Sequence, residues 1–396
     1  HFASAYTASP VCVPARCSLI HGQYPPKLSC FDNGDPMPDD RPSLMHLLTE
    51  AGYRTHGIGK MHFTPDLQAL RGFQTREYQE EIRRRVEDDD YLKLLHANGF
   101  EHVHDPFGVR GEMYYVPQPA QMPASLHGTN WVGDRAVEFL SAAPASEPFF
   151  LFASFIHPHP PFSPPTPWHK LYRAPLMPLP KRPDNCEALH TYVNRVQNRY
   201  KYRDNGLDNN LLRVMKAYYY ACISFVDLQV GRMLKALEDT GRLDDTLVVF
   251  TSDHGEFLGD YNCFGKRSML DAAAAVPLLM RYPERFPGGG RCETPVSAVD
   301  LMPTILQAAG LDTAPHDLDG IDLTGVVAGE SSDRTLYGQY QCEARGVYMA
   351  VNRRWKYFYS APDRREFLFN RVQDPEETRN RAGLVFCRQE LEQMRS

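Results

Sequence analysis

Three apolar runs, rich in aromatic and β-branched residues, constrain the fold of this chain more than any other feature. They span residues 149–155, 246–251 and 276–282. In the first two runs apolar residues follow one another without polar alternation, which predicts central strands of a sheet that is covered on both faces. The third run follows soon after and predicts a further strand of the same core.

Helical patterns accompany these strands. Apolar residues recur at helical spacing over residues 211–239, and shorter helices are predicted at 44–51 and 301–309. A glycine supplies each stop, and Asp300 is expected to cap the last helix. Alternating strands and helices predict an α/β fold with a large, mostly parallel central sheet flanked by helices.

The pattern of residues changes after about residue 335. Short aromatic strands are predicted at 347–351, 355–359 and 367–369, with a closing helix near Gln389. This pattern predicts a small C-terminal antiparallel α+β subdomain over residues 335–396, packed on a catalytic α/β domain over residues 1–334. Long loops are expected at 158–180 and 198–210, where proline and polar residues gather.

Composition excludes several classes of protein. The formal net charge of −6 leaves no basic face for nucleic acid, and the longest apolar stretches are too short for a membrane span. Nine cysteines without C-x-x-C pairs argue against a zinc ribbon or a disulfide scaffold and indicate buried thiols. Because the chain opens at His1 in an irregular stretch, we expect a fragment, and its compartment and oligomeric state stay open.

Two groups of polar residues follow the strong strands, where ligands gather in open α/β sheets. Asp253 and His254 come after the second run, and together they offer a carboxylate oxygen and an imidazole to a metal. His157 and His159 come after the first run. On local sequence alone, a helix cap beside a structural histidine explains Asp253 and His254 as well as a metal site does. A rigid loop whose histidines are hydrogen-bonded explains His157 and His159 better than a functional site does.

A more specific pattern lies near the start of the chain. Cys12, Pro14 and Arg16 form the string C-x-P-x-R, and residues 52–62 end in G-K-x-H at Lys60 and His62. This pair of motifs resembles the signatures of the sulfatase family, which belongs to the alkaline phosphatase superfamily. The resemblance runs on to the D-P-x-E-x-x-N string at 374–380 and so covers nearly the whole chain.

The resemblance implies a hydrolase of sulfuric esters. In such enzymes the cysteine, here Cys12, is oxidised by a formylglycine-generating maturation enzyme to formylglycine, which acts as nucleophile and metal ligand. The other residues that the resemblance places in catalysis are Arg16 and Lys60 on the diol and sulfate, His62 on the second hydroxyl, and His159 and Lys266 on the sulfate or its leaving oxygen. His157 is the second choice for the role of His159.

The resemblance also implies one divalent metal, held by Cys12, Asp253 and His254. Oxygen-rich ligation favours Ca²⁺, while the histidine leaves Mn²⁺ or Mg²⁺ open. The substrate would be a small-molecule or glycan sulfate ester, whose leaving group the loops at 77–116 and 171–210 would select.

Three departures from the family pattern stand out. The family's pair of metal-binding aspartates lies on a strand that would precede His1. Val13 stands where the family usually has a small or hydroxyl residue, and Tyr261 and Asn262 stand where a histidine and a glycine are common.

Two alternatives stay open: a phosphonate monoester or phosphodiester hydrolase of the same superfamily, and a non-catalytic protein whose Cys12 is unmodified. Retention of the cations downstream of Cys12 argues against the second alternative, because unused buried charges are costly.

Overall fold

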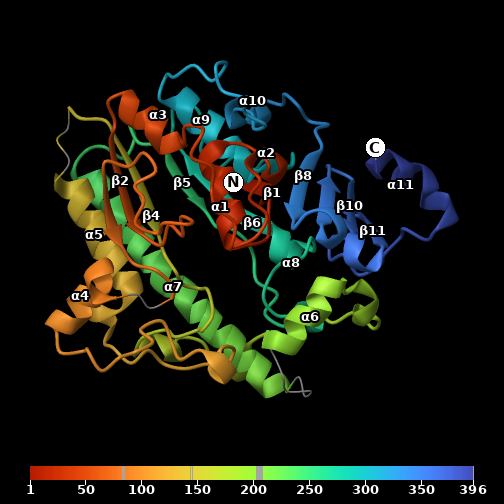
Figure 1. The fold of residues 1–396 in the computed structure, drawn as a ribbon, viewed down its shortest axis with the longest axis horizontal. Helices are drawn as coiled ribbons and strands as arrows, with labels where there is room; N and C mark the ends of the chain where they lie inside the picture. The colour runs from red at the N-terminus through yellow and green to blue at the C-terminus, as the bar shows by residue number, and fades with distance from the viewer. Residues whose placement is uncertain (83–84, 143, 145, 202–207, 396) are drawn as a thin grey trace.

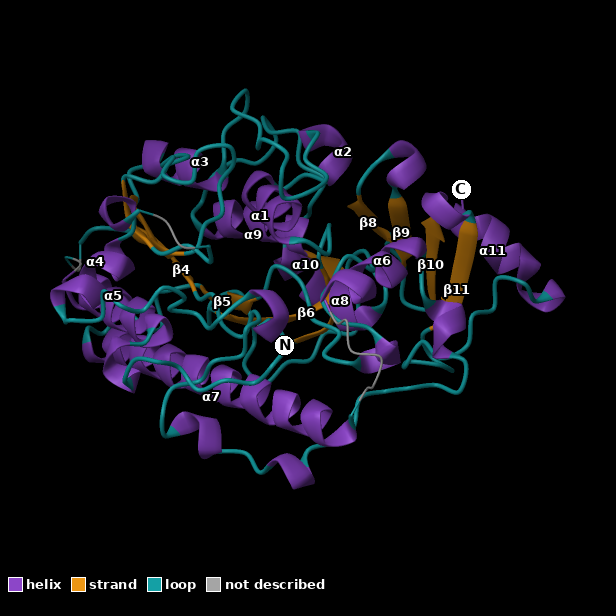
Figure 2. Cartoon of the chain, turned by 60° about the horizontal axis from the view of Figure 1, so that its bottom comes forward, coloured by secondary structure: helices purple, strands orange, loops and turns teal. Residues whose placement is uncertain are grey.

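A computed structural model describes residues 1–396 except 83–84, 143, 145, 202–207 and 396. Its core is a layer of strands between two layers of helices (Figure 2). Helices α1 (Cys12–His21), α3 (Leu44–Glu50) and α9 (Leu301–Ala308) cover one face. Helices α4 (Asp90–Ala97), α5 (Gly128–Ala142) and α7 (Asn209–Asp239) cover the other.

The strand layer consists of two sheets. The first has the order β5 (Val248–Thr251), β6 (Ala275–Arg281), β1 (Phe2–Tyr6) and β7 (Val296–Ser297), in which β1 and β7 are parallel and β6 is antiparallel to both its neighbours. The second is parallel throughout, in the order β3 (Thr75–Tyr78), β2 (Arg54–Gly59) and β4 (Phe149–Ser154). The predicted α/β class, with a helix-flanked core containing parallel strands, is confirmed.

The first two apolar runs do not form central strands in the described residues. They form β4 and β5, each of which is the outermost strand of its sheet, and most of their side chains are only half-buried. Phe250 in β5 is 37% exposed. A continuous apolar run indicates that its residues favour burial, but it does not indicate how many strands lie beside it in the sheet.

The three predicted helices are present as α7, α3 and α9, but the expected cap by Asp300 is wrong. A short 3-10 turn over Ala298–Asp300 leads directly into α9, so Asp300 already lies within a continuous turn. Its fully buried carboxylate accepts the backbone N–H of Ser297 at 2.7 Å and pairs with Arg334 at 2.8 Å. Asp300 therefore ties the start of α9 to the segment that precedes the C-terminal sheet.

The C-terminal antiparallel sheet is confirmed. Its order is β11 (Arg365–Asn370), β10 (Trp355–Ser360), β9 (Val347–Val351) and β8 (Leu336–Tyr340), and α11 (Arg388–Arg395) packs on it at one side of the molecule (Figure 1). One apolar cluster includes Tyr6 of β1 together with Phe358 and Phe367 of this sheet. The sheet therefore shares core with the rest of the chain, and a domain boundary at residues 334 and 335 stays a prediction.

A buried ion cluster also joins these two parts. Lys356 of β10 is fully buried, and its ammonium lies 2.5 Å from Asp271 and 2.7 Å from Glu377. Asp271 begins α8 (Asp271–Ala274), and Glu377 belongs to the D-P-x-E-x-x-N string. Part of the motif that carried the family resemblance thus has a structural role.

The remaining helices are short connectors: α2 (Pro25–Leu28), α6 (Tyr192–Lys201) and α10 (Leu323–Val327). The expected loop at 198–210 is wrong at both ends, because 198–201 close α6 and 209–210 open α7; residues 202–207 lie outside the described residues. All nine cysteines are free thiols, and most are buried, as predicted. Among the helices described, none combines the length and apolarity that crossing a bilayer requires.

Candidate active site

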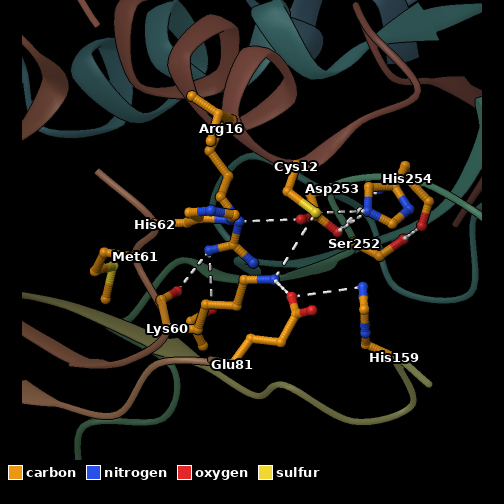
Figure 3. A network of polar contacts seen from close by, with 12 residues as sticks. Cys12, Arg16, Lys60, Met61, His62, Glu81, His159, Ser252, Asp253 and His254 are labelled. Atoms are coloured by element: carbon orange, nitrogen blue, oxygen red, sulfur yellow. Dashed lines mark hydrogen bonds and ion pairs between the residues drawn. The ribbon is translucent and has the colours of Figure 1, made fainter. Parts of the chain in front are cut away.

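One edge of the strand layer gathers the residues singled out from the sequence. Strands β2 and β4 are parallel, so their carboxyl ends lie on the same side of their sheet. Strands β1 and β5 are both antiparallel to β6, so their carboxyl ends also lie on one side of their sheet. The segments that leave these ends carry Lys60, His159, Cys12 and Asp253 (Figure 3). Because β6 runs the opposite way, the chain entering it starts from this edge, which explains how Lys266 reaches the same place.

Cys12 lies at the centre of this group, at the first residue of α1. Its Sγ is 3.1 Å from the Lys266 ammonium, 3.2 Å from His254 Nε2 and 3.8 Å from the Lys60 ammonium. Burial by itself raises the pKa of the Cys12 thiol, but the charges of Lys266 and Lys60 outweigh it and hold that pKa well below its usual value. The site therefore stabilises negative charge at residue 12.

Arg16 lies one helical turn after Cys12, on the same side of α1. Its guanidinium donates to the Asp253 carboxylate at 3.0 Å, to the Lys60 carbonyl at 2.6 Å and to Ser154 Oγ at 3.1 Å. One buried side chain thus joins the ends of β2, β4 and β5. This contact holds both sheets in register at the site.

The loop after β2 is shaped by close packing. Gly59 has a positive φ of 85°, and a Cβ there would lie 2.2 Å from the Ser154 carbonyl oxygen, so only glycine fits. Glu80 accepts the backbone N–H groups of Met61 and His62 at 3.2 and 3.0 Å. His62 Nδ1 is buried without a hydrogen-bond partner among the described residues. Among the described residues, the hydrogen-bonding capacity of this buried atom is therefore unused.

The two histidines after β4 have different surroundings. His159 Nε2 lies 3.1 Å from the Lys266 ammonium, and burial, with the Lys266 charge, lowers the pKa of His159 to about 4, although Glu81 opposes that shift. His157 instead faces the interior, with its ring nitrogens near Thr129 and Ser163. The geometry therefore brings His159 to the site and leaves the second choice, His157, in the core.

Cys12, Asp253 and His254 form a group with metal-ligand geometry, since one potential ligand atom from each lies within 4.8 Å of the others. Burial alone raises the pKa of Asp253, but His254 and Arg16 hold it well below its usual value, so the carboxylate stays ionised. A buried anionic oxygen beside an imidazole suits a divalent cation. The residues present thus fit the expected metal.

Two residues that the sequence did not single out complete the pocket. Glu81 lies 2.6 Å from the Lys60 ammonium and 3.5 Å from His159 Nε2 (Figure 3), and it also pairs with Arg110. Glu81 follows β3, whose carboxyl end lies at the same edge. The rule that selected Asp253 would have selected Glu81 as well, had the short polar strand before it been recognised.

Comparison with known proteins decides the family. A family model described as "Sulfatase" matches residues 1–311, and one described as "N-sulphoglucosamine sulphohydrolase, C-terminal" matches residues 259–394. The chain belongs to the sulfatase family. This sulfatase is 28% identical to an arylsulfatase of Clostridium perfringens, over 96% of the chain and 82% of that protein. It is 30% identical to a choline-sulfatase of Rhizobium meliloti, over 96% of the chain and 75% of that protein.

A solved structure extends the likeness to the fold. The phosphonate monoester hydrolase of Agrobacterium radiobacter superposes with a TM-score of 0.85 and 25% identity, covering 99% of this chain and 86% of that one. The predicted sulfatase fold and the predicted class of enzyme are therefore confirmed.

Proposed function

We propose that this sulfatase hydrolyses sulfate monoesters after Cys12 has been oxidised to formylglycine by a maturation enzyme. The observation that carries the proposal is the position of Cys12 Sγ, which lies 3.1 Å from Lys266, 3.8 Å from Lys60 and 3.2 Å from His254. The hydrated aldehyde would supply a hydroxyl nucleophile at this point. A tetrahedral anionic group held here would face cations on several sides, which is what charge development on sulfuryl oxygens requires.

The roles of the surrounding residues follow from their contacts. Lys60 and Lys266 would bind the sulfate oxygens, and Arg16, buried against Asp253, would keep the nucleophile and the metal ligand at a fixed spacing. His159 is uncharged at neutral pH and its Nδ1–H donates to the Pro160 carbonyl, so its Nε2 carries a lone pair that can accept a proton in the site. His62 would hydrogen-bond the group at residue 12 through its free ring nitrogen.

Asp253, His254 and residue 12 would hold one divalent metal, for which Ca²⁺ is our first choice and Mn²⁺ or Mg²⁺ the alternatives. When bound, the metal would supply positive charge that polarises the sulfuryl oxygens and lowers the pKa of a coordinated hydroxyl. Asp253 Oδ2 accepts from Arg16, so Oδ1 is the oxygen that would bind the metal while this ion pair stays in place.

A second activity has support from the comparisons. A phosphonate monoester hydrolase shares the fold, and a "multifunctional alkaline phosphatase superfamily protein" of Trinickia caryophylli is 30% identical over 88% of the chain. Phosphonate monoesters, like sulfate monoesters, carry one negative charge on a tetrahedral centre. Hydrolysis of phosphonate monoesters or phosphodiesters is therefore the alternative function, and a non-catalytic protein with unmodified Cys12 is the remaining one.

One experiment separates these possibilities. The protein is expressed with a formylglycine-generating partner, and mass analysis of the peptide containing Cys12 reports whether the thiol has become an aldehyde. Hydrolysis of an aryl sulfate and of an aryl phosphonate is then compared, with Cys12→Ala as the matched control. Conversion of Cys12 with preferred aryl sulfate turnover supports the proposal; preferred phosphonate turnover or an unmodified, inactive protein overturns it.

A further inference from the structure

Glu81 places a negative charge inside a pocket that otherwise collects cations for an anionic substrate. Its carboxylate lies 2.6 Å from Lys60, and its side chain is only 13% exposed. Arg110, at the more exposed side, pairs with the other carboxylate oxygen. Burial alone raises the pKa of Glu81, but the ammonium groups of Lys60 and Lys266 hold it well below its usual value, so Glu81 is ionised at neutral pH.

The position of this carboxylate matters because it is close to residue 12. One oxygen of Glu81, one ring nitrogen of His159 and Cys12 Sγ lie within 4.8 Å of one another. A sulfate group held beside residue 12 by Lys60 and Lys266 would therefore have the Glu81 carboxylate as a neighbour. Two like charges at such a distance repel, and the repulsion grows in proportion to the charge on the bound group.

Hydrolysis of a sulfate monoester doubles that charge. The bond between sulfur and the leaving oxygen breaks, the oxygen of water stays on the sulfur, the alcohol departs and a proton is released. The substrate carries one negative charge, and the inorganic sulfate product carries two at neutral pH. Glu81 therefore opposes the product twice as strongly as the substrate.

We propose that Glu81 is a specificity-determining residue, which lets the site hold singly charged sulfuryl esters while releasing doubly charged sulfate and rejecting phosphate monoester dianions. This inference rests on the proposed function, because it assumes that the tetrahedral anion binds beside residue 12. Arg110 pairs with one carboxylate oxygen of Glu81 and Lys60 with the other, which keeps the carboxylate in place.

The test compares two anions of similar shape and different charge. Inhibition constants of inorganic sulfate, with two charges, and methanesulfonate, with one, are measured against aryl sulfate hydrolysis by the modified enzyme. At about 5 Å and the dielectric constant of water, Coulomb's law predicts that Glu81→Gln tightens methanesulfonate binding about fourfold and sulfate binding about sixteenfold. The lower dielectric of a buried site enlarges both factors but keeps the second the square of the first.

Two further variants control this result. Glu81→Asp keeps the charge and should keep the wild-type ratio of the two inhibition constants, whereas a merely structural role would make it behave like Glu81→Gln. Glu101→Gln removes an exposed carboxylate and should leave both constants unchanged. Equal factors for the two anions in Glu81→Gln, or no change in either, would overturn the inference.

The proposed function and this inference fail in different ways. If the modified wild-type enzyme does not hydrolyse aryl sulfate, the proposed function fails. Binding of the same two anions to protein with unmodified Cys12 is then measured by calorimetry, which needs no turnover. A charge-dependent effect of Glu81→Gln in that experiment supports the inference on its own, and a charge-independent effect overturns it.

Discussion

The charge around Cys12 should set how readily its thiol ionises, and Lys266 is the nearest cation at 3.1 Å. With an effective dielectric constant of about 20, an ammonium at this distance attracts a thiolate by about 5 kcal/mol, before the cost of burial is subtracted. Replacing Lys266 by methionine keeps much of the side-chain volume and removes this attraction. We therefore expect Lys266→Met to raise the pKa of Cys12, which its neighbours now hold well below its usual value.

The assay is a pH titration of thiolate ultraviolet absorbance in the unmodified protein. Burial raises the pKa of Cys222 and Cys263, so Cys12 should titrate at lower pH than these thiols, and Cys12→Ser should remove its transition. Lys93→Met, which removes a half-exposed lysine on α4, serves as the control. If Lys266→Met and Lys93→Met titrate at the same pH as the wild type, the electrostatic reasoning about the site is refuted.

Four further outcomes are expected. In the modified full-length enzyme, Cys12→Ala should lower kcat for an aryl sulfate by at least about a thousandfold, and a chelator should abolish turnover until Ca²⁺ is restored. Lys356→Met should lower the free energy of unfolding in urea by about 3–5 kcal/mol, because it removes the cation that pairs with the buried carboxylate of Glu377 and the partly exposed carboxylate of Asp271; exposed Lys235→Met should change it little. Burial lowers the pKa of His127 from 6.5 to about 4, so its contribution to stability is present above pH 6.5 and is lost as the pH falls toward 4. His127→Gln should therefore flatten the pH dependence of unfolding in that window.

The sequence predicted the elements with strong periodicity well. Apolar spacing from residue 211 and the stop at Gly241 match α7 (Asn209–Asp239) to within two residues. Asp300 shows the limit of such reasoning, because an aspartate before an apolar helix looks the same whether it caps that helix or continues a 3-10 turn. The positions of β4 and β5 at sheet edges depend on strand pairing, which a single strand sequence does not encode.

The candidate site was likewise predictable from the sequence only in part. The motifs predicted that Cys12 and Lys60 belong to one site, and the rule about strand ends added Asp253. Glu81 was not predicted as a site residue because it lies in a charged stretch of sequence, which is typical of a solvated surface. Its partners Lys60 and Arg110 are distant in sequence, and only the fold brings them to it.

The edges that β4 and β5 form in the two core sheets have a practical consequence for anyone who prepares this protein. Within the described residues, β4 and β5 each carry one row of backbone N–H and C=O groups that no neighbouring strand satisfies, flanked by partly exposed apolar side chains such as Phe250. Rows of this kind recruit any extended polypeptide that reaches them. Concentrated solutions of residues 1–396 should therefore self-associate through these rows, and a lysine placed at position 250 should keep the material dispersed.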